Sequence, residues 1–232
     1  MTTATRGDVE MAAAWRLLAL GFSPPAEKTL AEIEALAEAL FDMGTSPELD
    51  ALLGAVRATS PGVLATQYAA LFRGTVRVAP YEGSYELDPI RQGRQMADVA
   101  GFYRAFGAEA HGPGAERPDY VGCELEFLAF LELRRLAAED ADEDGREVLD
   151  GIRAAFLEDH VGRWLPTFFA EVRAVAGDAP VYHALARLGE AVLSGELERH
   201  ELTPSLLPRR GPSSSLDADA LECGASEADL PM

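Results

Sequence analysis

Residues 116–131, Glu-Arg-Pro-Asp-Tyr-Val-Gly-Cys-Glu-Leu-Glu-Phe-Leu-Ala-Phe-Leu, decide the fold class of this chain. Pro118 suits the first turn of a helix, because proline has a fixed φ and no amide to leave unpaired there. Apolar side chains then recur at helical spacing, as at Leu125 and Leu128, so one face is suited to a protein core. We expect a helix over 118–138.

A related start signal, a capping residue followed by proline, occurs four times. The side-chain oxygen of such a residue accepts a hydrogen bond from an unpaired amide of the first turn. The four pairs are Ser23-Pro24, Ser46-Pro47, Ser60-Pro61 and Asp88-Pro89. Apolar residues follow each pair at helical spacing, so each pair predicts a helix.

Further helices are expected over 90–106, 147–159, 161–176 and 180–194. Sustained alternation typical of a strand is missing, since 75–79 is long enough only for a connector. The sequence predicts an all-α fold, a single compact domain of about nine helices over 1–201. Residues 202–232 are rich in proline, serine and acids, and we expect a mobile, disordered tail.

The composition excludes several classes of partner. The chain has 232 residues, 20 Lys and Arg against 39 Asp and Glu, and a formal net charge of −19. Binding to nucleic acid or to an anionic membrane depends on basic residues, so neither partner is expected. No apolar run reaches the roughly 18 residues that span a bilayer. Residues 1–10 lack the pattern of a secretory signal, which predicts a cytoplasmic protein.

Candidates for metal binding and catalysis are weak. Residues 140–145, Asp-Ala-Asp-Glu-Asp-Gly, match the first half of a calcium-binding EF-hand loop, but Gly151 stands where the bidentate glutamate belongs. Cys123 and Cys223 have no metal-site spacing, and the four histidines are scattered. We therefore expect no catalytic residues, no metal and no cofactor. A metal-binding helical protein or hydrolase that uses the Asp140 to Asp144 acids remains the alternative.

Two segments are unlike ordinary connectors. The first is the loop 79–89, in which Tyr81, Glu82, Ser84 and Tyr85 stand close together. Tyrosine combines an apolar ring with a polar hydroxyl, which suits a peptide-binding surface. The second is the start of the 116–131 segment, where Asp119 can compensate the helix dipole or accept a cationic group. The alternative is that both segments only pack against the domain.

Four motifs in order resemble the TorD/DmsD/NarJ family of cytoplasmic redox-enzyme maturation chaperones. The loop motif is Pro-Tyr-Glu-Gly-Ser-Tyr at 80–85, and the helix motif is Glu-Arg-Pro-Asp-Tyr at 116–120 with Glu-Leu-Glu-Phe-Leu at 124–128. Upstream of the loop, 67–74 is similar to the family's segment there, and 159–169 resembles its His-x-x-x-Trp helix. The departure is Tyr120, where many members have histidine.

The resemblance implies a chaperone that is not an enzyme. Its partners would be the catalytic subunit of a molybdopterin oxidoreductase, of the dimethyl sulfoxide reductase type, and that subunit's twin-arginine signal peptide. It would hold the client from export until cofactor insertion and assembly are complete, as a monomer or homodimer without stable membrane association. The implied signal-peptide-binding residues are Tyr81, Glu82, Ser84, Tyr85, Glu116, Pro118, Asp119 and Tyr120.

Within that set, the acids Glu82, Asp119 and Glu116 would meet the two arginines of the peptide, while the tyrosines would line a groove. Two alternatives remain open. The domain could dock a folded partner without recognising a signal peptide, or the chain's own Arg209 and Arg210 could fold back as a pseudo-ligand.

Overall fold

The structure, a computed structural model, describes residues 6–108, 116–138 and 143–207. The described residues form helices joined by loops, which confirms the all-α prediction, and their only extended pairing is a single bridge between Tyr81 and Tyr120. The helices are α1 (Arg6–Phe22), α2 (Thr29–Met43), α3 (Pro47–Arg57), α4 (Pro61–Phe72), α5 (Pro89–Ala105), α6 (Val121–Ala137), α7 (Glu143–Phe156), α8 (Gly162–Val175) and α9 (Pro180–Arg199). Two short turns complete them, the 3₁₀ turn η1 (Glu82–Ser84) and the π-helical turn η2 (Leu157–Val161).

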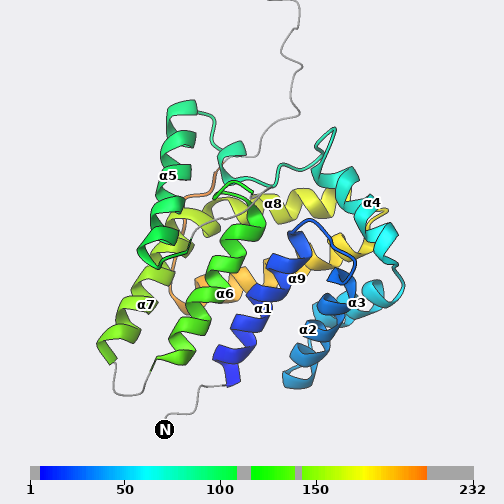
Figure 1. Cartoon of the computed structure of the whole chain (residues 1–232), viewed down its shortest axis with the longest axis horizontal. Coiled ribbons are helices and arrows are strands. Elements are labelled where there is room, and N and C mark those ends of the chain that lie inside the picture. The colour runs from blue at the N-terminus through cyan, green and yellow to red at the C-terminus, as the bar shows by residue number, and fades with distance from the viewer. Residues whose placement is uncertain (1–5, 109–115, 139–142, 208–232) are drawn as a thin grey trace, which may run out of the picture.

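Helices α1 and α6 pack along each other through the middle of the domain (Figure 1). Helices α5 and α7 lie on one side of this pair, and α2, α3 and α4 lie on the other. Helix α9 contacts α1, α3 and α8, so it closes the core from behind. Among the described residues, no helix is long and apolar enough to cross a membrane.

The core is rich in aromatic side chains. The ring of Phe22 lies 5.2 Å from that of Phe168, and Phe72 lies 5.5 Å from Tyr182, between ring centroids. Edge contacts of this kind add to the free energy of burial, which is about 1.5–3 kcal/mol for each fully buried large side chain. This cluster joins α1, α4, α8 and α9, elements far apart in the sequence.

Three of the four predicted caps are confirmed. The amide of Leu49 donates to Ser46 Oγ at 3.1 Å, and the amide of Ile90 donates to Asp88 Oδ1 at 2.9 Å. Ser60 caps α4 in the same way. The prediction at Ser23 is wrong: α2 begins only at Thr29, and the Ser23 hydroxyl donates to the Ala19 carbonyl at the end of α1.

The predicted start of the central helix is also wrong, since α6 begins at Val121 and not at Pro118. The residues before it turn instead toward the loop that contains Tyr81, and their backbone pairs with that loop. Asp119 therefore lies ahead of the helix and not in its first turn.

The chain beyond 201 continues along the domain as far as it is described. The Leu207 amide donates to the Arg163 carbonyl at 2.7 Å, and the Leu207 side chain is buried. The predicted boundary at 201 stays a prediction, because residues 208–232 lie outside the described part of the chain. Arg209, Arg210 and Cys223 lie there too.

Candidate functional site

The two motif segments lie against each other, backbone to backbone. The Glu82 amide donates to the Asp119 carbonyl and the Val121 amide donates to the Pro80 carbonyl, both at 2.9 Å. The bridge between Tyr81 and Tyr120 lies between these two bonds. The loop 79–89 and the residues 116–121 at the start of α6 therefore form one structural unit, which we call the loop unit. In the sequence, only the order of the motifs indicated that the two segments belong together.

Asp119 is a fully enclosed acid of this unit, with no exposed side-chain surface. Arg117 donates to both of its oxygens, Nε to Oδ1 at 2.9 Å and Nη2 to Oδ2 at 2.7 Å. Oδ2 also accepts the Gly83 amide at 3.1 Å. A Cβ at position 83 would lie 3.0 Å from Oδ2, so the loop's glycine permits this close approach.

Tyr81 and Glu116 form the outer edge of the unit. The Tyr81 hydroxyl donates to Glu116 Oε2 at 2.8 Å, and Arg73 pairs with the other oxygen of Glu116. Partial burial, and then the bond to Glu116, raise the pKa of Tyr81 to about 12. Tyr81 therefore stays a neutral donor at physiological pH, which suits it to hold a carboxylate in place.

Tyr120 and Tyr85 are buried beneath this surface. The Tyr120 hydroxyl donates to the Phe22 carbonyl at 2.5 Å and lies 2.8 Å from the Tyr68 hydroxyl. The Tyr85 hydroxyl lies 3.1 Å from the Ala79 carbonyl. Burial raises the pKa of Tyr120. The predicted contact of these two rings with a ligand stays a prediction, since in the structure they support the loop from within.

Glu82 is also fully buried and faces a residue whose role the sequence did not reveal. His160 Nδ1 lies 3.1 Å from Glu82 Oε2, and both side chains are enclosed. His160 belongs to the π-helical turn η2, a local distortion that often marks a functional position. The His-x-x-x-Trp motif was the only sequence signal for this residue.

Glu124, close enough to Glu82 for their charges to interact, is a further buried acid that is not among the predicted site residues. Its Oε2 accepts a hydrogen bond from Trp164 Nε1 at 2.8 Å. Burial and the nearby charge of Glu82 raise the pKa of Glu124 well above its usual value. The inner part of the site is therefore a carboxyl pair with a histidine and a tryptophan.

The remaining predicted residues contribute through the backbone. The Pro118 carbonyl accepts the Tyr103 hydroxyl at 2.8 Å, and the half-buried Ser84 donates its amide to the Tyr81 carbonyl at 3.0 Å. The structure thus brings all eight predicted residues into the loop and the turn before α6. Among the predicted residues, Glu116 is the partly exposed acid and Tyr81 is the partly exposed aromatic residue.

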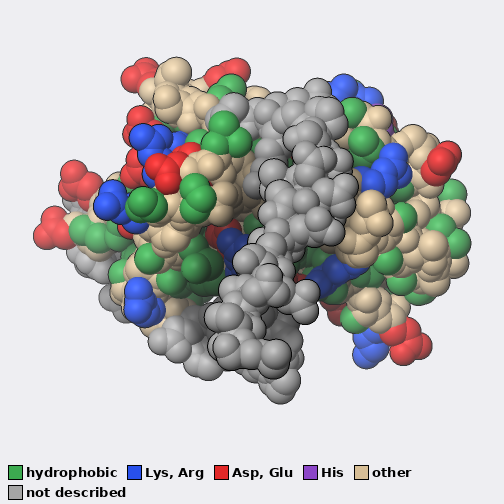
Figure 2. All heavy atoms as spheres, turned by 90° about the horizontal axis from the view of Figure 1, so that it is seen from above, with side chains coloured by type: hydrophobic (Ala, Val, Ile, Leu, Met, Phe, Trp, Pro, Cys, Tyr) green, Lys and Arg blue, Asp and Glu red, His purple; other side chains and the backbone are tan. Residues whose placement is uncertain are grey.

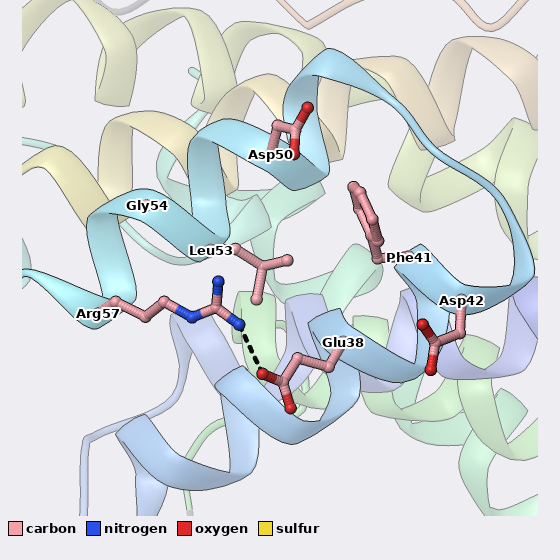
Figure 3. Close-up of a pocket in the computed structure, with 7 residues that line it drawn as sticks. All are labelled: Glu38, Phe41, Asp42, Asp50, Leu53, Gly54 and Arg57. Atoms are coloured by element: carbon pink, nitrogen blue, oxygen red, sulfur yellow. Dashed lines mark hydrogen bonds and ion pairs between the residues drawn. The ribbon is translucent and has the colours of Figure 1, made fainter.

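A pocket elsewhere lies between α2 and α3 (Figure 3). It has a volume of about 420 Å³. Its arginine, Arg57, donates to Glu34 and Glu38, and no residue of the loop unit lines it. Within the described part of the chain, no group of three or more His, Cys, Asp or Glu side chains could hold a metal ion. Asp140 and Asp142, the core of the metal alternative, lie outside the described residues.

The excess of acid does not gather into one patch on the face seen from above. Figure 2 shows acidic, basic and apolar side chains interspersed over the described part of that face.

Comparison with a solved structure shows a protein with the same fold. The crystal structure of a putative redox enzyme maturation protein from Archaeoglobus fulgidus superimposes with a TM-score of 0.53 at 21% identity, covering 79% of this chain and 94% of that chain. The two proteins therefore share a fold.

The sequence model of the nitrate reductase delta subunit family matches residues 21–170, and the chain belongs to this family. The selenate reductase assembly chaperone protein of Thauera selenatis is 34% identical over 62% of this chain and 74% of that protein. The perchlorate reductase assembly chaperone protein of Dechloromonas aromatica is 33% identical over 52% of both chains. The chlorate reductase assembly chaperone protein of Ideonella dechloratans is 36% identical over 45% of this chain.

The chain spans about half the length of the last two relatives, 52% and 55%. All three are assembly chaperones and not enzymes, which confirms the family and the non-enzymatic class expected from the four motifs.

Proposed function

We propose that this chain is a cytoplasmic assembly chaperone for a molybdopterin oxidoreductase of the dimethyl sulfoxide reductase type. It binds the twin-arginine signal peptide of the catalytic subunit and holds the apoprotein until cofactor insertion is complete. Three relatives named as assembly chaperones for selenate, perchlorate and chlorate reductases support the client class. Binding and release are sufficient for this task, so no catalytic group is required.

The observation that carries the peptide-binding part is the joining of the two motif segments. Backbone hydrogen bonds between the loop and the residues at the start of α6 bring a partly exposed tyrosine, Tyr81, next to two acids of the turn, Glu116 and Asp119. A peptide that carries two arginines needs carboxylates beside an aromatic face. The unit provides both.

Titration calorimetry tests this function with a synthetic peptide that has an adjacent arginine pair followed by an apolar run. We expect binding by the full chain and much weaker binding of the same peptide with two glutamines in place of the arginines. Asp119→Asn keeps the shape of the side chain but removes its charge, and should weaken binding by about 1.5–3 kcal/mol. Asp150→Asn is the matched control, because Asp150 is a carboxylate paired with Arg135 away from the loop.

Equal affinity for the arginine and glutamine peptides would refute signal-peptide recognition. A further arm adds the client apoprotein without its signal sequence. If the chain binds this truncated apoprotein as tightly as the complete one, the result would favour the alternative in which the domain docks only a folded partner.

A further inference from the structure

Two acids of the turn before α6, Asp119 and Glu116, are already paired with arginines of the chain itself. Arg117 donates to both oxygens of Asp119, and Arg73 pairs with Glu116. The side chain of Arg117 is 51% exposed and that of Arg73 is 48% exposed. Each guanidinium therefore covers its carboxylate from the solvent side.

Each of these arginines also lies over a tyrosine ring. The guanidinium carbon of Arg117 is 4.9 Å from the centre of the Tyr81 ring, and that of Arg73 is 5.8 Å from the centre of the Tyr68 ring. A carboxylate that accepts hydrogen bonds beside a ring that accepts a cation is a favourable environment for a guanidinium group. The structure thus contains two subsites for arginine, each with a resident occupant.

The two subsites adjoin each other through Tyr81. Its ring lies under Arg117, while its hydroxyl donates to Glu116, the partner of Arg73. A ligand that engages both subsites must therefore present two guanidinium groups close together, as an adjacent arginine pair does.

We infer that Arg73 and Arg117 are internal stand-ins for the two arginines of the incoming peptide, which displaces them when it binds. This inference rests on the proposed function and adds a statement about how the affinity of the site is set. It assigns Asp119 with Tyr81, and Glu116 with Tyr68, as the two arginine subsites. Glu82 is not an arginine subsite, because its carboxylate faces the buried His160.

A resident arginine has a clear physical reason at Asp119. A carboxylate with no exposed surface is costly when it is left without a cation, so the empty receptor needs an occupant of its own. Exchange of one guanidinium for another keeps that carboxylate paired throughout. The displaced Arg117 side chain is already half in solvent, and the Gly83 amide continues to donate to Asp119.

Competition of this kind lowers the apparent affinity for the peptide, because only the fraction of molecules with open subsites can bind. Removing a stand-in should therefore tighten binding, on the order of tenfold for an occupant that is docked about nine-tenths of the time. If Arg73 and Arg117 only stabilise the loop, their removal should weaken peptide binding, because the binding site would be less well ordered.

The experiment measures affinity of the arginine-pair peptide for Arg73→Gln, Arg117→Gln and the double variant. Arg73→Gln is the safest for folding, since its partner Glu116 is itself 20% exposed and can be hydrated. Arg117→Lys is a further variant. It keeps a cation beside Asp119 but cannot make the bidentate contact with both carboxylate oxygens. Arg187→Gln is the matched control, an exposed arginine paired with Glu48 between α9 and α3.

We expect tighter binding for each of the four site variants, most for the double variant, and no change for Arg187→Gln. If the unaltered chain binds the peptide but Arg73→Gln and Arg117→Lys bind it equally or more weakly, the inference is overturned and the proposed function stands. If neither the unaltered chain nor any folded variant binds the peptide, the proposed function itself fails.

Discussion

Glu124 shows at the scale of one residue how the interior of the site controls ionisation. Its carboxyl group is fully buried, accepts a hydrogen bond from Trp164 at 2.8 Å and lies near the charge of Glu82. Burial is the largest cause of its raised pKa, and the Trp164 bond opposes it only in part. The folded chain therefore keeps a proton on Glu124 at pH values where the unfolded chain has lost it.

This difference predicts how Glu124→Gln changes stability with pH. Between the usual carboxyl pKa and the raised one, the folded state binds more protons than the unfolded state, so wild-type stability falls as pH rises. Glutamine cannot ionise and still offers an oxygen to Trp164. We therefore expect Glu124→Gln to be more stable than the wild type at about pH 8, with the difference closing toward about pH 4.

Urea unfolding at several pH values measures this difference. Glu126→Gln is a control on the same helix, since Glu126 is half exposed and paired with Arg16. A difference between Glu124→Gln and the wild type that stays constant with pH would contradict the assignment of the proton to Glu124.

At the scale of the element, three helices share one buried cation. Arg153 on α7 pairs with Glu132 on α6, and its Nη1 lies 3.1 Å from Glu196 Oε2 on α9. All three side chains are buried. The guanidinium thus compensates two enclosed carboxylates and fixes how α6, α7 and α9 pack together.

Arg153→Met should therefore destabilise the fold strongly. Methionine fills much of the volume but leaves the buried Glu132 without its cation, while Glu196 keeps Arg199 at 2.9 Å. Removing one partner of a buried ion pair costs about 3–5 kcal/mol. Arg173→Met is the matched control, because Arg173 makes an exposed pair with Glu190 that contributes at most about 1 kcal/mol. Chemical denaturation of both variants gives the comparison, and similar losses would show that the buried cluster has no special role.

The elements were predictable from the sequence where a local signal defines them. The caps at Ser46 and Asp88 depend on residues two or three positions apart, and each begins a helix as predicted. At Ser23 the same signal misled, because the hydroxyl bonds back to Ala19 and ends the preceding helix. A capping residue followed by proline can serve either helix, and only packing decides which.

That the two motif segments belong together could be predicted from the sequence, but which of their side chains are buried could not. The motifs named Glu82 and Asp119 together, and the structure brings their segments into direct contact. The sequence could not show that Glu82 faces His160 across the interior, nor that Arg117 closes over Asp119. These contacts depend on how separate helices pack, and no local spacing encodes that.

At the scale of the whole molecule, the net charge of −19 acts together with the site. Acidic and basic side chains are interspersed on the face of Figure 2, so under the proposed function the attraction for a cationic peptide would be a property of the whole charge distribution. Attraction of this kind acts over a distance and speeds encounter. The paired contacts at Asp119 and Glu116, in contrast, act only after docking.

This division of roles predicts how salt affects the two rate constants of peptide binding. Screening shortens the reach of exposed charges to about 10 Å at 0.1 M salt, so the association rate constant should fall roughly tenfold between about 0.02 M and about 0.3 M salt. The dissociation rate constant should change far less, because it depends on enclosed contacts such as those of Asp119.

Stopped-flow fluorescence with a labelled arginine-pair peptide measures both rate constants. Asp119→Asn should raise the dissociation rate constant while leaving the salt dependence of the association rate constant intact. If salt acts mainly on dissociation, or if Asp119→Asn removes the salt dependence of association, attraction comes from the site itself and not from the acidic surface as a whole.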